Sequence, residues 1–157
     1  MADLYIMCGA PGSGKSYWLD HHVKKGSVVS RDAIRFSLLN NDDDYFSHED
    51  EVYKEFWKNI NTGLKLGLDV FADQTSLTPK SRKYLIDHVH GYDNVNAIWI
   101  KTDLNDCLDN NAKRTGREYV PSEQLISMYK RFIPPSFGEG FFRIFKYENG
   151  IIKYKGR

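Results

Sequence analysis

The sequence has few cysteines and no long apolar run. Only two of its 157 residues are cysteine, Cys8 and Cys107, and their spacing fits neither a metal-ligand pair nor a disulfide framework. We expect both to be reduced core residues. No apolar run approaches the ~18 residues of a membrane span, and no basic stretch followed by an apolar one opens the chain. We therefore expect a cytoplasmic protein without membrane contact.

The net charge of the chain is close to zero. The chain has 22 Lys and Arg residues against 21 Asp and Glu, a net charge of +1. This value argues against a generalised electrostatic nucleic-acid binder but leaves a local basic patch open. A hydrophobic content of 41% with 14% aromatics is ordinary for a globular core. The length is that of one domain, so we expect residues 1–157 to form a single domain.

The most informative motif is GAPGSGKS at Gly9–Ser16, which fits GxxxxGK[ST]. An apolar run precedes it and a helix-compatible segment follows, as in a phosphate-binding P-loop. This context argues against the alternative, a glycine-rich turn that binds nothing. In a P-loop, backbone N–H groups surround a polyphosphate, Lys15 reaches its β and γ phosphates, and the Ser16 hydroxyl ligates Mg²⁺. The motif predicts a nucleoside triphosphate site formed by Gly12, Ser13, Gly14, Lys15 and Ser16.

Strand and helix signals alternate along the rest of the chain. Strands are predicted at 3–8, 27–29, 68–73 and 96–101, followed by a hairpin of 141–147 and 151–154 around an Asn-Gly turn. Helices are predicted at 15–25, 30–39, 47–66, 78–91, 103–113 and 120–132. Ser30 is expected to cap the second helix, and Ser47 to open a capping box for the third. The alternation predicts an α/β fold, a parallel sheet sandwiched by helices.

In such folds ligands bind beyond the carboxyl ends of the strands, where polar side chains follow two strands of this chain. Asp32 and Arg35 lie one helical turn apart on one face. Asp32 is placed to accept a proton from an acceptor hydroxyl, unless it is only a helix-dipole acid beside a surface arginine. Asp73 ends the third strand, where its carboxylate can bind the waters of a Mg²⁺ ion or orient the acceptor. An ordinary turn aspartate is the alternative.

The polar segment Lys113–Arg117 is a third cluster. Arg114 and Arg117 make it a candidate lid that closes over the triphosphate and stabilises charge on the transferring phosphoryl group. A solvated basic loop is the alternative. Basic residues at 80–83 and 130–131 add charge suited to a phosphate backbone, and the acidic 40–44 segment is interpreted as a solvated loop rather than a cation site.

These segments together resemble the P-loop kinase family, in particular the 5′-kinase domain of phage-type polynucleotide kinase-phosphatases. The resemblance spans residues 4–135 and is carried by GAPGSGKS, SRDAIR, ADQTSLTPKSR and NAKRTGREYVPSEQLISMYKRF. It implies a P-loop NTPase-type sheet with an arginine-bearing helical lid. It also implies transfer of a phosphoryl group from ATP, with Mg²⁺, to the 5′-hydroxyl end of RNA or DNA.

The resemblance also implies roles for single residues. Lys15 and Ser16 would hold ATP·Mg²⁺, and Asp73 would organise the acceptor and the metal waters. Asp32 would activate the 5′-hydroxyl as general base, and Arg35 would contact the neighbouring phosphate of the acceptor. The lid would bind the donor phosphates through Arg114, with Arg117 as a second candidate.

Two other functions remain open from the residues alone. One is a kinase whose acceptor is a nucleoside or another small hydroxyl compound. The other is a regulator that binds ATP without transferring its phosphate.

Overall fold

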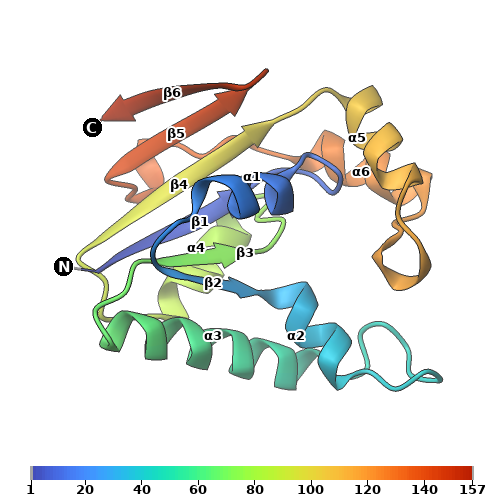
Figure 1. The fold of residues 1–157 in the computed structure, drawn as a ribbon, viewed down its shortest axis with the longest axis horizontal. Coiled ribbons are helices and arrows are strands. Elements are labelled where there is room, and N and C mark those ends of the chain that lie inside the picture. Colours follow the sequence, from blue (N-terminus) through green and yellow to red (C-terminus); the bar gives the residue numbers. More distant parts are fainter. Residues whose placement is uncertain (1, 157) are drawn as a thin grey trace.

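The computed structural model describes residues 2–156 as a six-stranded sheet with helices on both faces (Figure 1). The strands are β1 (Asp3–Cys8), β2 (Ser27–Ser30), β3 (Val70–Asp73), β4 (Asn94–Lys101), β5 (Arg143–Glu148) and β6 (Ile151–Gly156). Their order is β2-β3-β1-β4-β5-β6, with β1 to β5 parallel and β6 antiparallel to β5. This arrangement confirms the predicted P-loop NTPase-type fold. Because all six strands share one sheet, it also supports the expectation of one domain, which stays a prediction.

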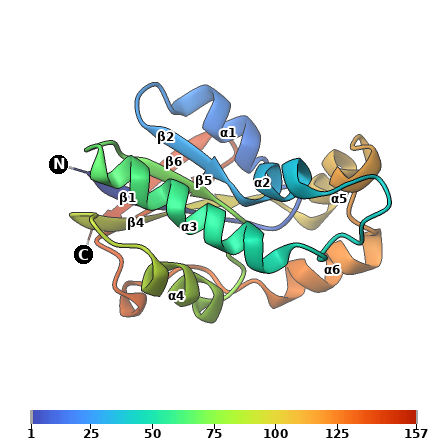
Figure 2. The ribbon, with the colours of Figure 1, turned by 90° about the horizontal axis from the view of Figure 1, so that it is seen from below.

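The helices cover the sheet on opposite sides. They are α1 (Lys15–His22), α2 (Arg31–Leu38), α3 (Glu49–Lys65), α4 (Pro79–His88), α5 (Leu104–Ala112) and α6 (Ser122–Arg131), with single 3₁₀ turns η1 (Gly116–Glu118) and η2 (Phe137–Glu139). Figure 2 shows α1 on one side of the sheet and α3 and α4 on the other. Every helix within residues 2–156 is too short or too polar to cross a bilayer.

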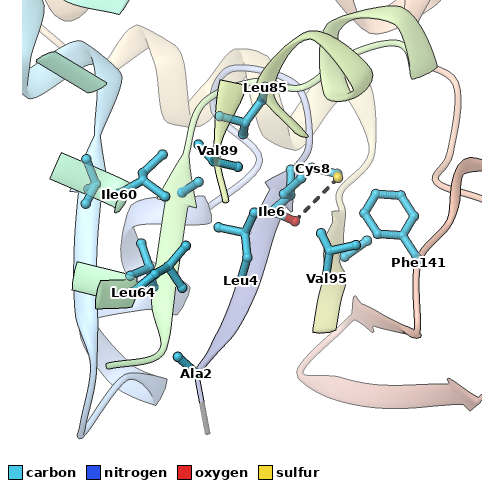
Figure 3. Packing of buried hydrophobic residues seen from close by; sticks show 14 of the residues in the cluster. Ala2, Leu4, Ile6, Cys8, Ile60, Leu64, Leu85, Val89, Val95 and Phe141 are labelled. Atoms are coloured by element: carbon cyan, nitrogen blue, oxygen red, sulfur yellow. Dashed lines mark hydrogen bonds between the residues drawn. The ribbon is translucent and has the colours of Figure 1, made fainter. Parts of the chain in front are cut away.

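Buried apolar side chains attach the helices to the sheet. On one face, Leu4 and Ile6 of β1 belong to the same cluster as Ile60 of α3 and Leu85 of α4 (Figure 3). On the other, Met7 of β1 packs in a cluster with side chains of α1. Alternate residues of a strand point to opposite faces, so the central strand supports both layers.

Both cysteines are buried free thiols, as expected. The Cys8 thiol donates a hydrogen bond to the carbonyl oxygen of Ile6 at 3.5 Å (Figure 3). Burial raises the pKa of Cys8 to about 12 and that of Cys107 to about 11. Neither thiol is therefore deprotonated to a reactive thiolate near neutral pH.

Several predicted element ends are wrong by a few residues. Helix α1 stops at His22 instead of residue 25, because Val23 takes an extended conformation and packs against the α1-side cluster. The capping box at Ser47 is also wrong. The N-cap of α3 is His48, and the Ser47 hydroxyl donates to the carbonyl oxygen of Asp44 at 2.7 Å. Ser47 belongs to the preceding turn, one residue too early to cap.

Two local predictions are confirmed. The Ser30 hydroxyl caps α2 by accepting a hydrogen bond from the Ala33 N–H at 3.1 Å. The Asn149-Gly150 pair joins β5 to β6 with φ values of 51° and 76°, which suit the turn of a two-residue hairpin.

Candidate active site

The P-loop leaves the carboxyl end of β1 and leads into α1. Gly12 and Gly14 have φ values of 79° and 100°, which residues with a Cβ rarely adopt. A Cβ on Gly12 would lie 2.3 Å from the carbonyl oxygen of Cys107, whereas no described atom lies within 4 Å of a Cβ on Gly14. At the start of α1, the N–H groups of Lys15 and Ser16 lack intrahelical acceptors. The loop thus packs closely against Cys107 at Gly12, and at the start of α1 its N–H groups can donate to an anion.

Neighbouring elements hold the P-loop in place. The Thr102 hydroxyl donates to the carbonyl oxygen of Ser13 at 2.6 Å, and the Asn110 side chain donates to that of Gly12 at 2.8 Å. The Gly9 N–H donates to the carbonyl oxygen of Thr75, beyond β3, at 3.2 Å. The sequence gives no motif from which the supporting roles of Thr102 and Asn110 could be inferred.

Lys15 lies at the centre of a group of charged side chains. Its ammonium donates to the carbonyl oxygens of Gly9 and Ala10 at 2.8 and 3.0 Å. Burial lowers the pKa of Lys15, Asp73 and Asp32 act to raise it, and Arg114 acts to lower it. The structure therefore brings together four of the residues singled out in the sequence, from four separate segments.

Strand pairing explains how the two aspartates meet. Ser30, the last residue of β2, is the register partner of Asp73, the last residue of β3. Asp32 follows two residues after Ser30 in the first turn of α2. Burial raises the pKa of Asp73, Lys15 opposes this shift, and Asp32 adds to it. Parallel in-register strands thus carry both carboxylates to the same edge of the sheet.

Asp32 is accessible but held in place. Its side chain is 63% exposed and accepts a hydrogen bond from Arg35, whose side chain is only 4% exposed. The Tyr45 hydroxyl lies 3.3 Å from the same Asp32 oxygen and 3.0 Å from a guanidinium nitrogen of Arg35. In this arrangement Arg35 orients Asp32. The phosphate contact expected of Arg35 stays a prediction, and burial leaves little of this side chain open to an acceptor.

Glu49, at the start of α3, connects two arginines and was missed as a site residue. Arg35 donates to its carboxylate through Nη2 at 2.6 Å and Nε at 3.0 Å, and Arg31 donates through Nη2 at 2.6 Å. Burial raises the pKa of Glu49, but these hydrogen bonds outweigh burial and leave the pKa below its ordinary value. In the sequence Glu49 is one of several acids at the beginning of a helix, so its partners could not be inferred.

The segment 113–119 is attached at its base and near its tip. Asn111 accepts from the Val120 N–H at 3.0 Å and donates to the Val120 carbonyl oxygen at 2.6 Å, closing the base. Arg117 donates to the carbonyl oxygens of Asn40, Asn41 and Asp43 at 2.9, 3.0 and 2.9 Å. Arg117 thus links this segment to the loop after α2. Its contact with the donor phosphates stays a prediction.

A cavity of about 700 Å³ opens beside the P-loop. Its lining includes the P-loop from Gly12 to Gly14, Ser16, Arg114, residues of α5 and the turn from Tyr147 to Gly150. The volume lies within the range of small-molecule and cofactor sites. Arg114 therefore faces the same space as the P-loop, as the lid hypothesis requires, and the carboxyl-terminal hairpin contributes one wall.

The donors expected for Mg²⁺ fit a P-loop metal site. Among residues 2–156, no cluster of three or more His, Cys, Asp or Glu side chains is placed to hold a metal, including in the acidic 40–44 loop. Magnesium in nucleotide sites does not need such a cluster, because it retains waters and binds through one or two protein oxygens plus phosphate oxygens. The Ser16 hydroxyl beside Lys15 and the carboxylate of Asp73 are oxygens of this kind.

One basic residue in the 80–83 segment does not face solvent. Arg82 is fully buried and donates to both oxygens of Glu139, at 2.6 and 3.1 Å, and to the carbonyl oxygens of Ser76 and Ile133, at 2.7 and 2.9 Å. The expectation that Arg82 meets a phosphate backbone is wrong. Its charge anchors the loop after β3 to the segment after α6.

The fold and the loop geometry define a P-loop NTPase-type protein. A family model described as an AAA domain (AAA_33) matches residues 4–135, and the chain belongs to that family. No curated protein matches the sequence.

Solved structures share the fold at low sequence identity. A chain of the Pnkp1/Rnl/Hen1 RNA repair complex is 20% identical, with a TM-score of 0.70 over 83% of this chain and 43% of that one. This chain therefore spans less than half the length of that match. A gluconokinase from Sinorhizobium meliloti 1021 is 16% identical, with a TM-score of 0.54 over 85% and 76% of the two chains. Kti12 from Chaetomium thermophilum, in complex with ADP-AlF3, is 13% identical, with a TM-score of 0.56 over 86% and 82%.

Proposed function

We propose that the protein transfers the γ-phosphoryl group of ATP to the 5′-hydroxyl end of a polynucleotide, RNA or DNA. The observation that carries this proposal is an exposed carboxylate, Asp32, which Arg35 holds in place and whose charge acts on the P-loop lysine. The similarity to a chain of an RNA repair complex supports a nucleic-acid acceptor. The P-loop with Lys15 and Ser16 supports the nucleotide donor.

Different residues act on the acceptor hydroxyl and on the phosphates of ATP. Asp32 takes the proton of the acceptor hydroxyl while the oxygen of that hydroxyl forms a bond to the γ-phosphorus of ATP. The bond between the γ-phosphorus and the β–γ bridging oxygen breaks, and ADP leaves. Arg35 holds Asp32 in position for this transfer. Lys15 and Arg114 stabilise negative charge on the phosphates. Mg²⁺, when bound by Ser16 and Asp73, supplies further charge neutralisation.

The test is phosphate transfer from γ-labelled ATP to matched oligonucleotides. We expect label on DNA or RNA with a 5′-hydroxyl and none on the same oligonucleotide carrying a 5′-phosphate. The Asp32→Asn variant should lose about 10²- to 10⁴-fold in transfer rate and still bind ATP, because a general base acts only in the chemical step. ATP hydrolysis without any transfer to oligonucleotides would overturn the proposed acceptor.

A small-molecule acceptor is the second candidate. The observation that favours it is the shared fold with a gluconokinase, which extends over 85% of this chain and 76% of that one. Gluconate and other sugar hydroxyl compounds therefore belong in the same assay. Transfer to these compounds, with none to oligonucleotides, would select this candidate.

A further inference from the structure

We propose that a second cavity, between α3 and α4, binds the bases of a single-stranded polynucleotide acceptor. This inference rests on the proposed function and specifies its substrate class. The cavity has a volume of about 480 Å³ and is lined by the first half of α3, the loop after β3, and α4. Both helices lie on the same side of the sheet (Figure 2). Among the described residues, this cavity shares none with the cavity beside the P-loop.

Three aromatic side chains form one wall of this cavity. Tyr53 and Trp57 of α3 meet Tyr84 of α4, with the Tyr84 ring centroid 5.4 Å from that of Tyr53 and 5.6 Å from that of Trp57. His88 stacks on Trp57 at 3.9 Å and fixes its ring. Tyr84 remains 47% exposed. Exposed aromatic rings on a rigid support are the platforms on which nucleobases stack, largely without regard to sequence.

The cavity borders the candidate active site. Arg31 and Gln74 both line it, and they adjoin Asp32 and Asp73 in the chain. Arg31 donates to the Gln74 side chain at 3.4 Å, and its guanidinium lies 4.2 Å from the Tyr53 ring centroid. Arg31 thus lies between Asp32 and Tyr53, where it can contact a strand that extends from one to the other.

The charge around the cavity favours a polyanion. Its lining includes four basic residues, and Asp87 is the one acid that lines it within the described chain. Lys83 lies 2.8 Å from that carboxylate, and Arg31 lies 2.6 Å from the Glu49 carboxylate, so Lys80 and Arg131 are the two that form none of the described ion pairs. The basic residues are Arg31, Lys80, Lys83 and Arg131. This excess stands out in a chain of net charge +1, and it suits phosphates that link stacked bases better than a neutral sugar.

The test removes the Tyr84 ring from the protein and single nucleobases from the oligonucleotide, separately and together. Binding of a short 5′-hydroxyl oligonucleotide, labelled at its 3′ end, is measured by fluorescence anisotropy for wild type and Tyr84→Ala. The same measurement is repeated with the base removed, one position at a time, from each of the first three nucleotides. Removing a base that stacks in the cavity should weaken wild-type binding roughly 5- to 150-fold. Tyr84→Ala should bind the intact oligonucleotide correspondingly less tightly and be insensitive to that removal.

Two control variants separate stacking from general damage. Tyr84→Phe keeps the ring and should bind like wild type. Phe142→Ala removes a ring that is 42% exposed, just before β5 and outside this cavity, and should leave binding unchanged. Equal weakening of intact and base-free oligonucleotides by Tyr84→Ala would overturn the inference. If that variant fails to fold, wild-type binding that ignores every base removal would do the same.

Transfer of labelled phosphate, measured on the same samples, separates this inference from the proposed function. If phosphate is transferred but Tyr84→Ala is as sensitive as wild type to every base removal, the proposal that this cavity binds bases is overturned and the kinase proposal stands. Coupling without transfer supports the cavity and overturns the proposed reaction. Wild-type protein that neither binds nor phosphorylates the oligonucleotides overturns both.

Discussion

Glu49→Gln should destabilise the protein by removing the charge that balances two arginines. The carboxylate accepts three hydrogen bonds, two from Arg35 and one from Arg31, at 2.6 to 3.0 Å. Breaking a fully buried ion pair costs about 3–5 kcal/mol. Glu49 is 22% exposed and glutamine retains one acceptor oxygen, so we expect a loss of about 2–3 kcal/mol in the free energy of unfolding. Urea unfolding near neutral pH measures this loss.

The pH dependence of that loss tests its electrostatic origin. The pKa of Glu49 is lowered in the folded protein, so its ionised form contributes stability above the ordinary glutamate pKa of about 4.3. That contribution disappears as the pH falls through the lowered pKa. The difference between wild type and Glu49→Gln should therefore be constant above about pH 5 and shrink below about pH 4.

A neighbouring acid on the same helix is the matched control. The Glu51 side chain is 67% exposed, and its described ionic contact is with His48, at 3.6 Å. Glu51→Gln should change the free energy of unfolding by less than about 0.5 kcal/mol. A Glu49→Gln effect no larger than this, or one that persists undiminished at acidic pH, would refute the reasoning.

Three further substitutions test other parts of the site. Lys15→Ala should abolish measurable ATP binding in equilibrium dialysis while leaving the circular dichroism spectrum unchanged, because the hydrogen bonds described for the Lys15 ammonium go to loop carbonyl oxygens. Gly12→Ala should lower the unfolding temperature and reduce the free energy of unfolding by more than about 1–3 kcal/mol. The Cβ of the alanine would lie 2.3 Å from the carbonyl oxygen of Cys107, at a φ of 79°. Arg117→Ala should speed amide exchange in residues 40–44 by releasing their carbonyl oxygens. Unchanged exchange there would show that Arg117 does not hold this loop.

Signals that are local in the chain predicted much of the fold. The Gly9–Ser16 motif, the Ser30 cap and the Asn149-Gly150 turn each depend on the conformations of a few consecutive residues, and the structure has all three. Predictions failed where tertiary packing decided the outcome. Val23 left the predicted helix to pack against the sheet. Arg82 is buried against Glu139, 57 residues further along the chain.

Short patterns in the sequence specify the P-loop, the alternation of strands and helices, and the charged residues that follow the strands. They do so because glycine conformation, helix capping and side-chain periodicity act over a few residues. Which of those residues come into contact depends on the tertiary structure. The pairing of β2 with β3 carries Asp32 and Asp73 to the same edge, and the packing of α2 on α3 joins Arg35 to Glu49. Such contacts depend on strand order and burial over long sequence separations, which no local pattern specifies.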